Sequence, residues 1–392
     1  MTKLKKYIIP LSFFTTLSLC SSDNILSNSK NKILDYNSQK AIEDASKLKN
    51  DWVSPITYKY TYNKNENYTT KNSSINISQP IFKSGGIYYA IKYALSIKES
   101  SQISIENQRK ELIKQTVNTL FQINKININI EKQKLLIENA IIDIDRKKEQ
   151  VLNGIIDTSF LDNAILDKNS KQNSLIDLEY QKDVLIHNLS TLSDKTYDKF
   201  ELPVLELVDK NEFLNKNIYT KKLKYDIDTS YWMKNMVTSS YLPTVNFTGN
   251  YSKYHDTDNN PALDEDWNYN VGFNISIPLD IRYSNSIESS KISYLIEKAN
   301  LEDKKQSELV IYKNSLSKIK SIDDKMKITD ENIKLYDSLL EQLIEQQEVG
   351  MKTESDVMTM VNSKKIKLLD KKTLYFDKQI ELLEIYARVA NE

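Results

Sequence analysis

Four short segments of the chain alternate between apolar and polar residues, which is the pattern of two-faced strands. In residues 267–277 every odd position is aromatic or aliphatic and every even position is small or polar. Residues 56–62 place an isoleucine and three tyrosines on one side and two threonines and a lysine on the other. Residues 241–251 repeat the alternation, and residues 75–81 do so more weakly. Since successive strand side chains point to opposite faces, we expect two hairpins with one apolar and one polar face.

Each expected hairpin leads into a heptad-like apolar pattern that is far longer than a globular helix. These patterns cover residues 86–153 and 286–349, so each predicts a helix on the order of 100 Å long. Only coiled-coil packing against neighbouring helices stabilises a rod of this length in water. Shorter helices are expected at residues 33–50, 160–192, 218–240 and 356–390.

The two halves of the chain end their long helices with the same signature. Gly154 and Ser159 in the first half match Gly350 and Ser355 in the second, each glycine four residues after a Glu-Gln pair. A glycine after a long helix predicts a stop, and a Ser or Thr shortly beyond it predicts the cap of the next helix. The chain is therefore expected to reverse direction at both sites, and to be an internal duplication.

The first residues have the layout of a secretory signal peptide. Three lysines precede a mostly apolar run over residues 7–19, which is too short to cross a bilayer as a helix. Cys20, the only cysteine, follows this run and excludes an internal disulfide or a thiolate metal cluster. Lipidation of Cys20 and ordinary cleavage nearby both stay open, because Leu19 stands where lipoprotein signals usually place a small residue.

Composition narrows the classes of function. The 54 basic and 54 acidic side chains leave no positive excess, so nucleic acid is not expected as a partner. Six glycines and seven prolines are too few for a loop-rich domain of this length. The two histidines, His187 and His255, lie in different regions, and no phosphate loop or catalytic triad pattern occurs. The sequence therefore predicts no enzyme, no cofactor and no metal site.

Four strands alone cannot close a sheet in lipid. The apolar faces are dense in tyrosine, which favours a membrane interface, and the smallest known transmembrane barrels need eight strands. We therefore expect identical copies to share one barrel, whose polar face lines a wet lumen. That face is expected to comprise Thr57, Lys59, Thr61, Asn246, Thr248, Asn250, Asn268, Asn270, Asn274 and Ser276.

The motifs at residues 241–251 and 267–279, together with the paired glycine tips, resemble the TolC family of outer-membrane efflux and export proteins. The resemblance covers essentially the whole mature chain. It implies a mixed α/β membrane protein, a homotrimer with a twelve-stranded β-barrel in the outer membrane, four strands per chain. A long α-helical coiled-coil barrel would continue it in the periplasm and dock onto an inner-membrane pump through a periplasmic adaptor protein.

On this plan the chain divides into eight segments. Residues 1–20 are a signal peptide, 21–50 an N-terminal periplasmic helix, 51–83 the first barrel hairpin, and 84–192 the first coiled-coil pair with its tip near 154. Residues 193–217 are an irregular equatorial segment with one short strand at 204–208, and 218–240 are a helix. Residues 241–282 form the second barrel hairpin, and 283–392 the second coiled-coil pair with its tip near 350.

The resemblance also implies a gate at the periplasmic end. In the family, polar contacts between helices close this end, and acidic side chains just after the second tip narrow it. Lys352 and Asp356 match these positions, whereas Thr359 and Phe160 stand where the family has acidic residues. Three copies of Asp356 around an axis would make a cation-attracting ring. The alternative is a solvated pair of Lys352 and Asp356 at i,i+4 spacing.

The two tips match the family's adaptor-docking region, which includes Gly154, Ser159, Gly350 and Ser355 here. The alternative is that the glycines are simply helix stops. We therefore expect a passive exit duct for tripartite efflux or type I secretion, from periplasm to exterior. The competing hypothesis is a periplasmic or secreted coiled-coil scaffold whose aromatic strand faces are buried by protein.

Overall fold

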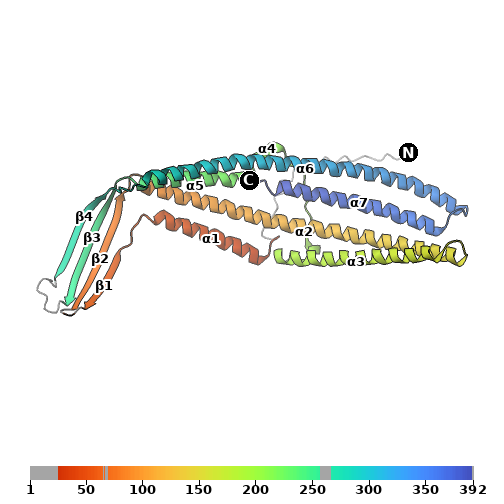
Figure 1. Ribbon diagram of the computed structural model, residues 1–392, viewed down its shortest axis with the longest axis horizontal. Helices are drawn as coiled ribbons and strands as arrows, with labels where there is room; N and C mark the ends of the chain where they lie inside the picture. Colours follow the sequence, from red (N-terminus) through yellow and green to blue (C-terminus); the bar gives the residue numbers. More distant parts are fainter. Residues whose placement is uncertain (1–24, 65, 67–68, 257–265, 391–392) are drawn as a thin grey trace, which may run out of the picture.

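Two very long helices run along most of the molecule, and a small sheet continues them at one end (Figure 1). The computed structural model describes residues 25–64, 66, 69–256 and 266–390. Helix α2 covers Gly86–Leu152 and helix α6 covers Tyr283–Glu348. With 67 and 66 residues, both are on the order of 100 Å long, as the heptad-like pattern predicted.

Shorter helices lie end to end beside the long ones (Figure 1). Helices α3 (Thr158–Leu192) and α1 (Asn28–Asn50) lie along α2, while α7 (Glu354–Tyr386) and α5 (Ile218–Ser240) lie along α6. Both α5 and α7 also contact α2. The helices therefore form one curved layer, in the order α3, α2, α7, α6 towards the tips, with α1 and α5 replacing α3 and α7 towards the sheet.

The sheet has four antiparallel strands in chain order, with β1 and β4 at its edges. The strands are β1 (Thr57–Lys64), β2 (Thr69–Phe82), β3 (Thr244–Asp256) and β4 (Trp267–Ser276). Their register aligns like with like: Asn76, Asn250 and Asn270 form one cross-strand row, and Ile75, Tyr251 and Tyr269 form the next. The alternation in the sequence thus becomes one polar and one apolar face, as predicted.

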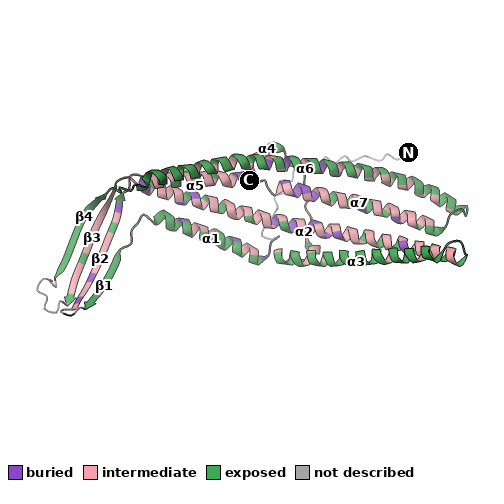
Figure 2. Ribbon diagram, viewed as in Figure 1, coloured by how far each residue is buried: buried purple, intermediate pink, exposed green. Residues whose placement is uncertain are grey.

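The main apolar core lies at mid-length, where α1, α2, α6 and α7 meet residues 193–217. Phe121 of α2, Phe213 of the short helix α4 (Lys210–Asn215) and Ile385 of α7 are fully buried there. Elsewhere the layer is one helix thick, so long stretches of the helices stay partly or fully exposed (Figure 2). The layer therefore offers little buried area of its own away from this core.

The strand expected at residues 204–208 is wrong. This segment forms no ladder, and it lies between a single 3₁₀ turn, η2 (Tyr197–Lys199), and α4. The backbone N–H of the buried Leu205 donates instead to Oε1 of Gln379 on α7, at 2.8 Å. A buried amide side chain thus satisfies the backbone where a neighbouring strand would have done so.

Several helix limits also differ from the expected ones. Helix α1 begins at Asn28, five residues earlier than the pattern suggested, because Ser27 caps it. Helix α7 ends at Tyr386 and not at residue 390, because Val389 forms a bridge with Asn217 ahead of α5. The expected signal peptide and Cys20 lie outside the described residues. Of the helices that the structure describes, none is long and apolar enough to cross a membrane.

Candidate functional site

Both helical tips are built as the same helix stop. Gly154 follows α2 with φ of +69°, and Gly350 follows α6 with φ of +75°. At the first tip the Ile155 N–H donates to the Gln150 carbonyl at 2.8 Å, and at the second the Met351 N–H donates to the carbonyl five residues before it, also at 2.8 Å. These are Schellman motifs, in which the left-handed residue is nearly always glycine. The glycines are thereby explained by backbone conformation alone.

The caps of the returning helices lie two residues before the expected serines. The Asp157 carboxylate caps α3 by accepting the Ser159 N–H at 2.8 Å, and Thr353 caps α7. Ser159 and Ser355 are exposed residues of the first helical turn. An Asp or Thr at the N-cap accepts backbone N–H groups that the helix itself leaves unpaired.

Exposed apolar side chains lie at both tips. Leu152 and Ile155 at the first tip are 77% and 68% exposed, and Val349 and Met351 at the second are 68% and 76% exposed. Phe160 adds a ring that is also exposed. Both tips therefore end in exposed apolar side chains.

Asp356, near the second tip, forms several hydrogen bonds and an ion pair. Its carboxylate accepts from the Thr353 N–H at 3.1 Å and from the Thr353 hydroxyl at 3.0 Å, and its own N–H donates to that hydroxyl, which completes a capping box. Its other oxygen forms an ion pair with Arg146 Nη2 of α2 at 2.7 Å. Asp356 therefore ties the start of α7 both to its own first turn and to the first coiled-coil pair.

The hydrogen bond from the Thr353 backbone is the main cause that holds the pKa of Asp356 below its ordinary value, with Arg146 and Lys352 adding smaller effects of charge. Lys352 itself is exposed and lies ahead of α7. Lys352 therefore lies outside the helix that holds Asp356, and the solvated pair of these two residues stays a prediction. Thr359 lies within α7, where its hydroxyl donates to the Ser355 carbonyl at 2.8 Å.

Arg146 was not among the residues predicted from the sequence, and it forms the last of a series of polar contacts, here called the polar ladder, between α2 and α7. Its signal is the seven-residue spacing of polar positions along α2. The rungs are Lys125 with Asp377 at 2.6 Å, Lys132 with Asp370 at 2.9 Å, Asn139 with Asn362 at 2.9 Å, and Arg146 with Asp356.

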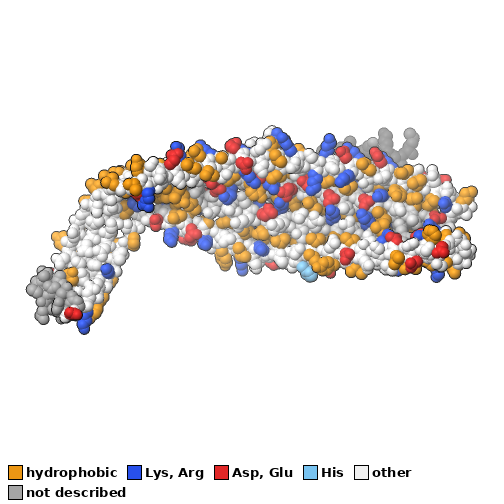
Figure 3. Space-filling view, in the orientation of Figure 1, with side chains coloured by type: hydrophobic (Ala, Val, Ile, Leu, Met, Phe, Trp, Pro, Cys, Tyr) orange, Lys and Arg blue, Asp and Glu red, His pale blue; other side chains and the backbone are white. Residues whose placement is uncertain are grey.

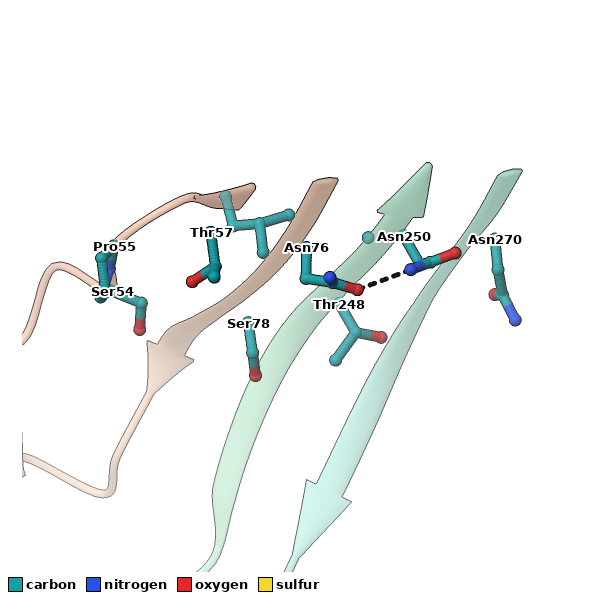
Figure 4. Close-up of a pocket in the computed structure, with 10 residues that line it drawn as sticks. Ser54, Pro55, Thr57, Asn76, Ser78, Thr248, Asn250 and Asn270 are labelled. Atoms are coloured by element: carbon teal, nitrogen blue, oxygen red, sulfur yellow. Dashed lines mark hydrogen bonds between the residues drawn. The ribbon is translucent and has the colours of Figure 1, made fainter. Parts of the chain in front are cut away.

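The polar face of the sheet forms a shallow hollow (Figure 4). Asn250 on β3 donates to the Asn76 side chain on β2 at 2.5 Å, and Thr57, Thr248 and Asn270 lie along the same face. These groups are uncharged donors and acceptors. Figure 3 accordingly shows charged side chains spread over the helical rod and few on the visible part of the sheet. The face suits contact with water more than recognition of one ligand.

The histidines and acidic side chains do not gather into a metal site in the part of the chain that the structure describes. Groups of three or more His, Cys, Asp or Glu side chains that could hold a metal ion are absent from the described residues. His255 lies on β3, where its Nε2 hydrogen-bonds with Ser73 at 2.7 Å, whereas His187 lies on α3.

The family model described as outer membrane efflux protein matches residues 235–363. The fold is similar to the CmeC outer membrane channel of Campylobacter jejuni, with a TM-score of 0.75 and 13% identity over 93% of this chain and 83% of that one. It is also similar to the outer membrane protein VceC of Vibrio cholerae, with a TM-score of 0.73 and 12% identity over 92% and 93%. The open MtrE outer membrane channel of Neisseria gonorrhoeae gives 0.69 and 11% over 92% and 86%. The comparison with curated proteins gave no match.

At 11–13% identity the solved structures show the fold alone. They are outer-membrane proteins, which is also the class that the family model describes. The matched region holds the end of α5, the second hairpin, α6 and the second tip. It thus includes the residues 241–251 and 267–279 on which the sequence resemblance depended. The chain has the mostly helical fold of outer-membrane channels, with four strands per chain, and resembles the outer membrane efflux proteins.

Proposed function

We propose that this chain is the outer-membrane exit duct of a tripartite efflux or type I secretion system. Three copies share one twelve-stranded barrel in the outer membrane, and their helical layers close into a tube in the periplasm. The duct is a passive conduit and catalyses no reaction. A periplasmic adaptor and an inner-membrane pump supply the cargo and the energy.

The observation that carries this proposal is the two-faced sheet with two open edges. Its apolar face is exposed in the single chain, with Tyr58, Tyr269 and Phe273 all more than half exposed. Its edges β1 and β4 present unpaired backbone groups that lipid cannot satisfy. Pairing β4 of one copy with β1 of the next satisfies both edges and turns every polar face inward.

The edges of the helical layer support the same assembly. The outer helix α3 exposes Leu166, Ile176 and Tyr180, and the opposite edge α6 exposes Ile328 and Leu335. Apolar stripes on the two outer helices of a layer fit each other when the layer closes into a ring. The exposed apolar tips are left for the adaptor, at the end of the tube furthest from the barrel.

Separation of inner and outer membranes, followed by the native mass of the extracted protein, tests the assembly. We expect a trimer in the outer-membrane fraction. A soluble monomer or dimer in the periplasm would overturn the duct and favour the coiled-coil scaffold. A Tyr269→Asp, Phe273→Asp variant, altered only on the apolar face, should lose membrane insertion and keep its helical circular dichroism.

We further propose that Asp356 and Arg146 control the periplasmic end of the duct, with Lys352 nearby. Arg146→Gln frees Asp356 from the neighbouring coiled-coil pair, so channels of this variant should open more often in planar bilayers. Asp356→Asn should in addition lower the preference for cations over anions, because the ring loses its charge. Asp377→Asn, which breaks an ion pair of the same ladder far from the tip, is the matched control and should change neither property. Equal behaviour of all three variants would contradict a gate at Asp356.

A further inference from the structure

The two hairpins of the sheet repeat each other position by position. Residues 76–78 of β2 and 274–276 of β4 both read Asn-Ile-Ser, and a proline follows two residues later in each strand. The registers of the hairpins agree with this match. Thr57 of β1 lies opposite the first of the two asparagines, and Asn246 of β3 lies opposite the second. Each residue of the first hairpin near this row therefore has a counterpart in the second.

The two hairpins meet within the chain where β2 pairs with β3, here called the inner seam. Ile77 lies opposite Gly249 in this seam, and Ser78 lies opposite Thr248. The inner seam joins the last strand of one hairpin to the first strand of the next. It therefore shows how consecutive hairpins of this chain pair with each other.

The last strand of the second hairpin has no such neighbour within the chain. Ile75 of β2 is 43% exposed, whereas its counterpart Phe273 of β4 is 71% exposed. Further along, Ile81 of β2 is 53% exposed, whereas its counterpart Leu279 is 95% exposed. The same positions of the repeat are thus covered by β3 in the first hairpin and left open in the second.

A fixed turn presents two apolar side chains at this open end. The Asp280 carboxylate accepts from the Arg282 backbone N–H at 2.8 Å and from the guanidinium of the same residue at 2.7 Å. Leu279 and Ile281, on either side of Asp280, are almost fully exposed. A turn that is already fixed loses little conformational entropy when another surface covers it.

The opposite edge of the sheet carries a matching surface, in the segment between α1 and β1. Val53 and Ile56 of this segment are both more than half exposed. The segment is held from inside the chain, because the Ser54 N–H donates to Gln79 Oε1 at 2.9 Å and Gln79 Nε2 donates to the Trp52 carbonyl at 3.0 Å. This segment and the turn after β4 both lie at the boundary between the sheet and the helices (Figure 1).

The helices next to the sheet show the same difference between the halves. Helix α2 is packed there between α1 and α5, and its Ala94 and Ser96 are buried. Helix α6 lies at the edge of the layer, and its Ile292, Leu295 and Ile296 are about half exposed. The open edge therefore continues from β4 onto the first turns of α6.

We propose that the first hairpin of a second copy completes this open edge in the register of the inner seam. The inference rests on the proposed function, in which β4 of one copy pairs with β1 of the next. Replacing each residue of the inner seam by its counterpart places Ser276 opposite Lys59 of the next copy, and Ile275 opposite Tyr60 of the next copy. The repeat thereby fixes the register of the joint between copies as well as its partners.

The chemistry of this outer seam supports the register. It pairs apolar residues with apolar residues, since Phe273 then lies opposite Tyr62 of the next copy, and cross-strand pairs of this kind stabilise sheets. A shift by one residue would set the apolar face of β4 against the polar face of β1. The turn residues Leu279 and Ile281 then lie beside Ile56 of the next copy, which covers the most exposed apolar groups of the edge.

Cysteine pairs test the register on the full chain in outer membranes. One variant combines Ser276→Cys with Lys59→Cys, and another combines Ile275→Cys with Tyr60→Cys. Opposite residues of antiparallel strands alternate between close and wide spacing, so one of these neighbouring pairs meets the distance that a disulfide needs. After oxidation with copper phenanthroline, we expect that variant to give covalent dimers and trimers on denaturing gels, and a reductant should return them to monomers.

Two controls accompany the pairs. Ser276→Cys with Thr61→Cys is shifted by two residues on the same face, so it should stay monomeric on the denaturing gel. The wild-type chain, whose only cysteine is Cys20, should do the same. A trimer in the outer membrane whose opposite cysteines stay unlinked, or in which the shifted pair links instead, overturns the register and leaves the duct intact. A monomer in the periplasm overturns the duct as well.

The turn after β4 is tested by the stability of the trimer. Leu279→Ser with Ile281→Ser should lower the temperature at which the trimer dissociates in dodecyl sulfate, because the joint loses two covered apolar side chains. Leu152→Ser with Ile155→Ser removes two exposed apolar side chains from the first tip and is the matched control, which should leave this temperature unchanged. Equal dissociation temperatures in the two double variants would overturn the contact of the turn with the next copy.

Discussion

The two halves of the chain share one backbone plan but join their helices by different side chains. In the first half, α3 meets α1 through the Ser27 N–H and the Leu192 carbonyl, at 2.8 Å, and through the exposed Asp194. In the second half, α7 meets α5 through the Ile218 N–H and the Arg388 carbonyl, at 2.9 Å. Only the second joint surrounds a fully buried carboxylate among the described residues. The two joints thus share the same kind of backbone hydrogen bond. They differ in the side chains around it, because only the second joint surrounds a buried carboxylate.

That carboxylate belongs to Glu308 of α6, which has no exposed surface. Arg388 Nη1 lies 3.0 Å from both of its oxygens, Lys304 lies 2.9 Å away, and Asn217 donates at 3.0 Å. Two cations and an amide compensate the cost of removing one carboxylate from water. The cluster therefore connects α6, the end of α7 and the start of α5 in one network.

The two coiled-coil pairs differ in the same way. Helices α6 and α7 are joined by Lys364 to Asp337 at 2.5 Å, Lys371 to Asp330 at 2.6 Å, and Lys378 to Asp323 at 2.7 Å, all at seven-residue spacing. No ion pair joins α2 to α3 among the described residues, and the polar bond between them is Gln133 to the Lys171 carbonyl. The ion pairs fix the register of α7 against α6, whereas α3 packs against α2 by its apolar face.

The largest expected effect comes from removing the carboxylate that distinguishes the second joint. Glu308→Ala removes the buried carboxylate that Arg388, Lys304 and Asn217 share and leaves Arg388 with Glu384 alone, so we expect the free energy of unfolding to fall by about 3 kcal/mol. Asp194→Ala at the first joint removes an exposed acceptor and should cost less than about 1 kcal/mol. Urea titration followed by the helical circular dichroism signal measures both. Equal losses in the two variants would contradict the contrast between the joints.

Repeated local patterns explain why most of the fold could be predicted. The heptad spacing in α2 and α6 and the alternation in β1–β4 are each decided by neighbours in sequence. Residues 204–208 also alternate, yet form no strand. There Leu205 is buried whereas Leu207, two residues further on, is exposed, so the segment does not keep one buried face. The partner of the Leu205 N–H, Gln379, lies 174 residues away. Nothing local to the segment could reveal that partner.

The candidate site likewise has residues that local sequence could predict and residues that depend on distant partners. Gly154 and Gly350 could be predicted because a left-handed residue after a helix is a local requirement. The ion pair of Arg146 with Asp356 joins residues that are 210 positions apart, and it requires α7 to lie beside α2 and not only beside α6. Lys352 was the nearer cation in sequence, but the start of α7 at Glu354 leaves it outside the helix.

The two helical tips test the comparison between the halves, because both tips have the same backbone conformation. Gly154→Ala and Gly350→Ala each force an L-residue to a positive φ, and each should cost about 1–2 kcal/mol. Beyond the glycine and its two chain neighbours, no heavy atom lies within 4 Å of the added Cβ at either position, so the cost comes from backbone strain. The urea midpoint of each variant measures the effect. A difference between the two of more than about 0.5 kcal/mol would show that the tips are not equivalent.

The ladder between α6 and α7 should contribute less. Its lysines are 32–42% exposed, and each such pair contributes about 0.3–0.5 kcal/mol. The triple variant Lys364→Gln, Lys371→Gln, Lys378→Gln should therefore lose about 1 kcal/mol at low salt. In 1 M salt most of the difference should disappear, because exposed charges are screened. Lys168→Gln on α3, which forms no ion pair in the structure, is the control and should show neither effect.

The smallest effect concerns the pH range in which the second tip keeps its capping box. A carboxylate whose pKa is lower in the folded than in the unfolded chain stabilises the fold above its ordinary pKa, near 3.9. That contribution is lost as the pH falls through the lower, folded value. The carboxyl carbon of Asp356, followed by NMR, should therefore titrate below 3.9. Thr353→Ala removes a hydroxyl donor and should raise this pKa more than Arg146→Gln does, because Asp356 and Arg146 are partly exposed and water screens their attraction. The opposite order would mean that the link between the two halves, and not the helix cap, holds Asp356 in its charged form.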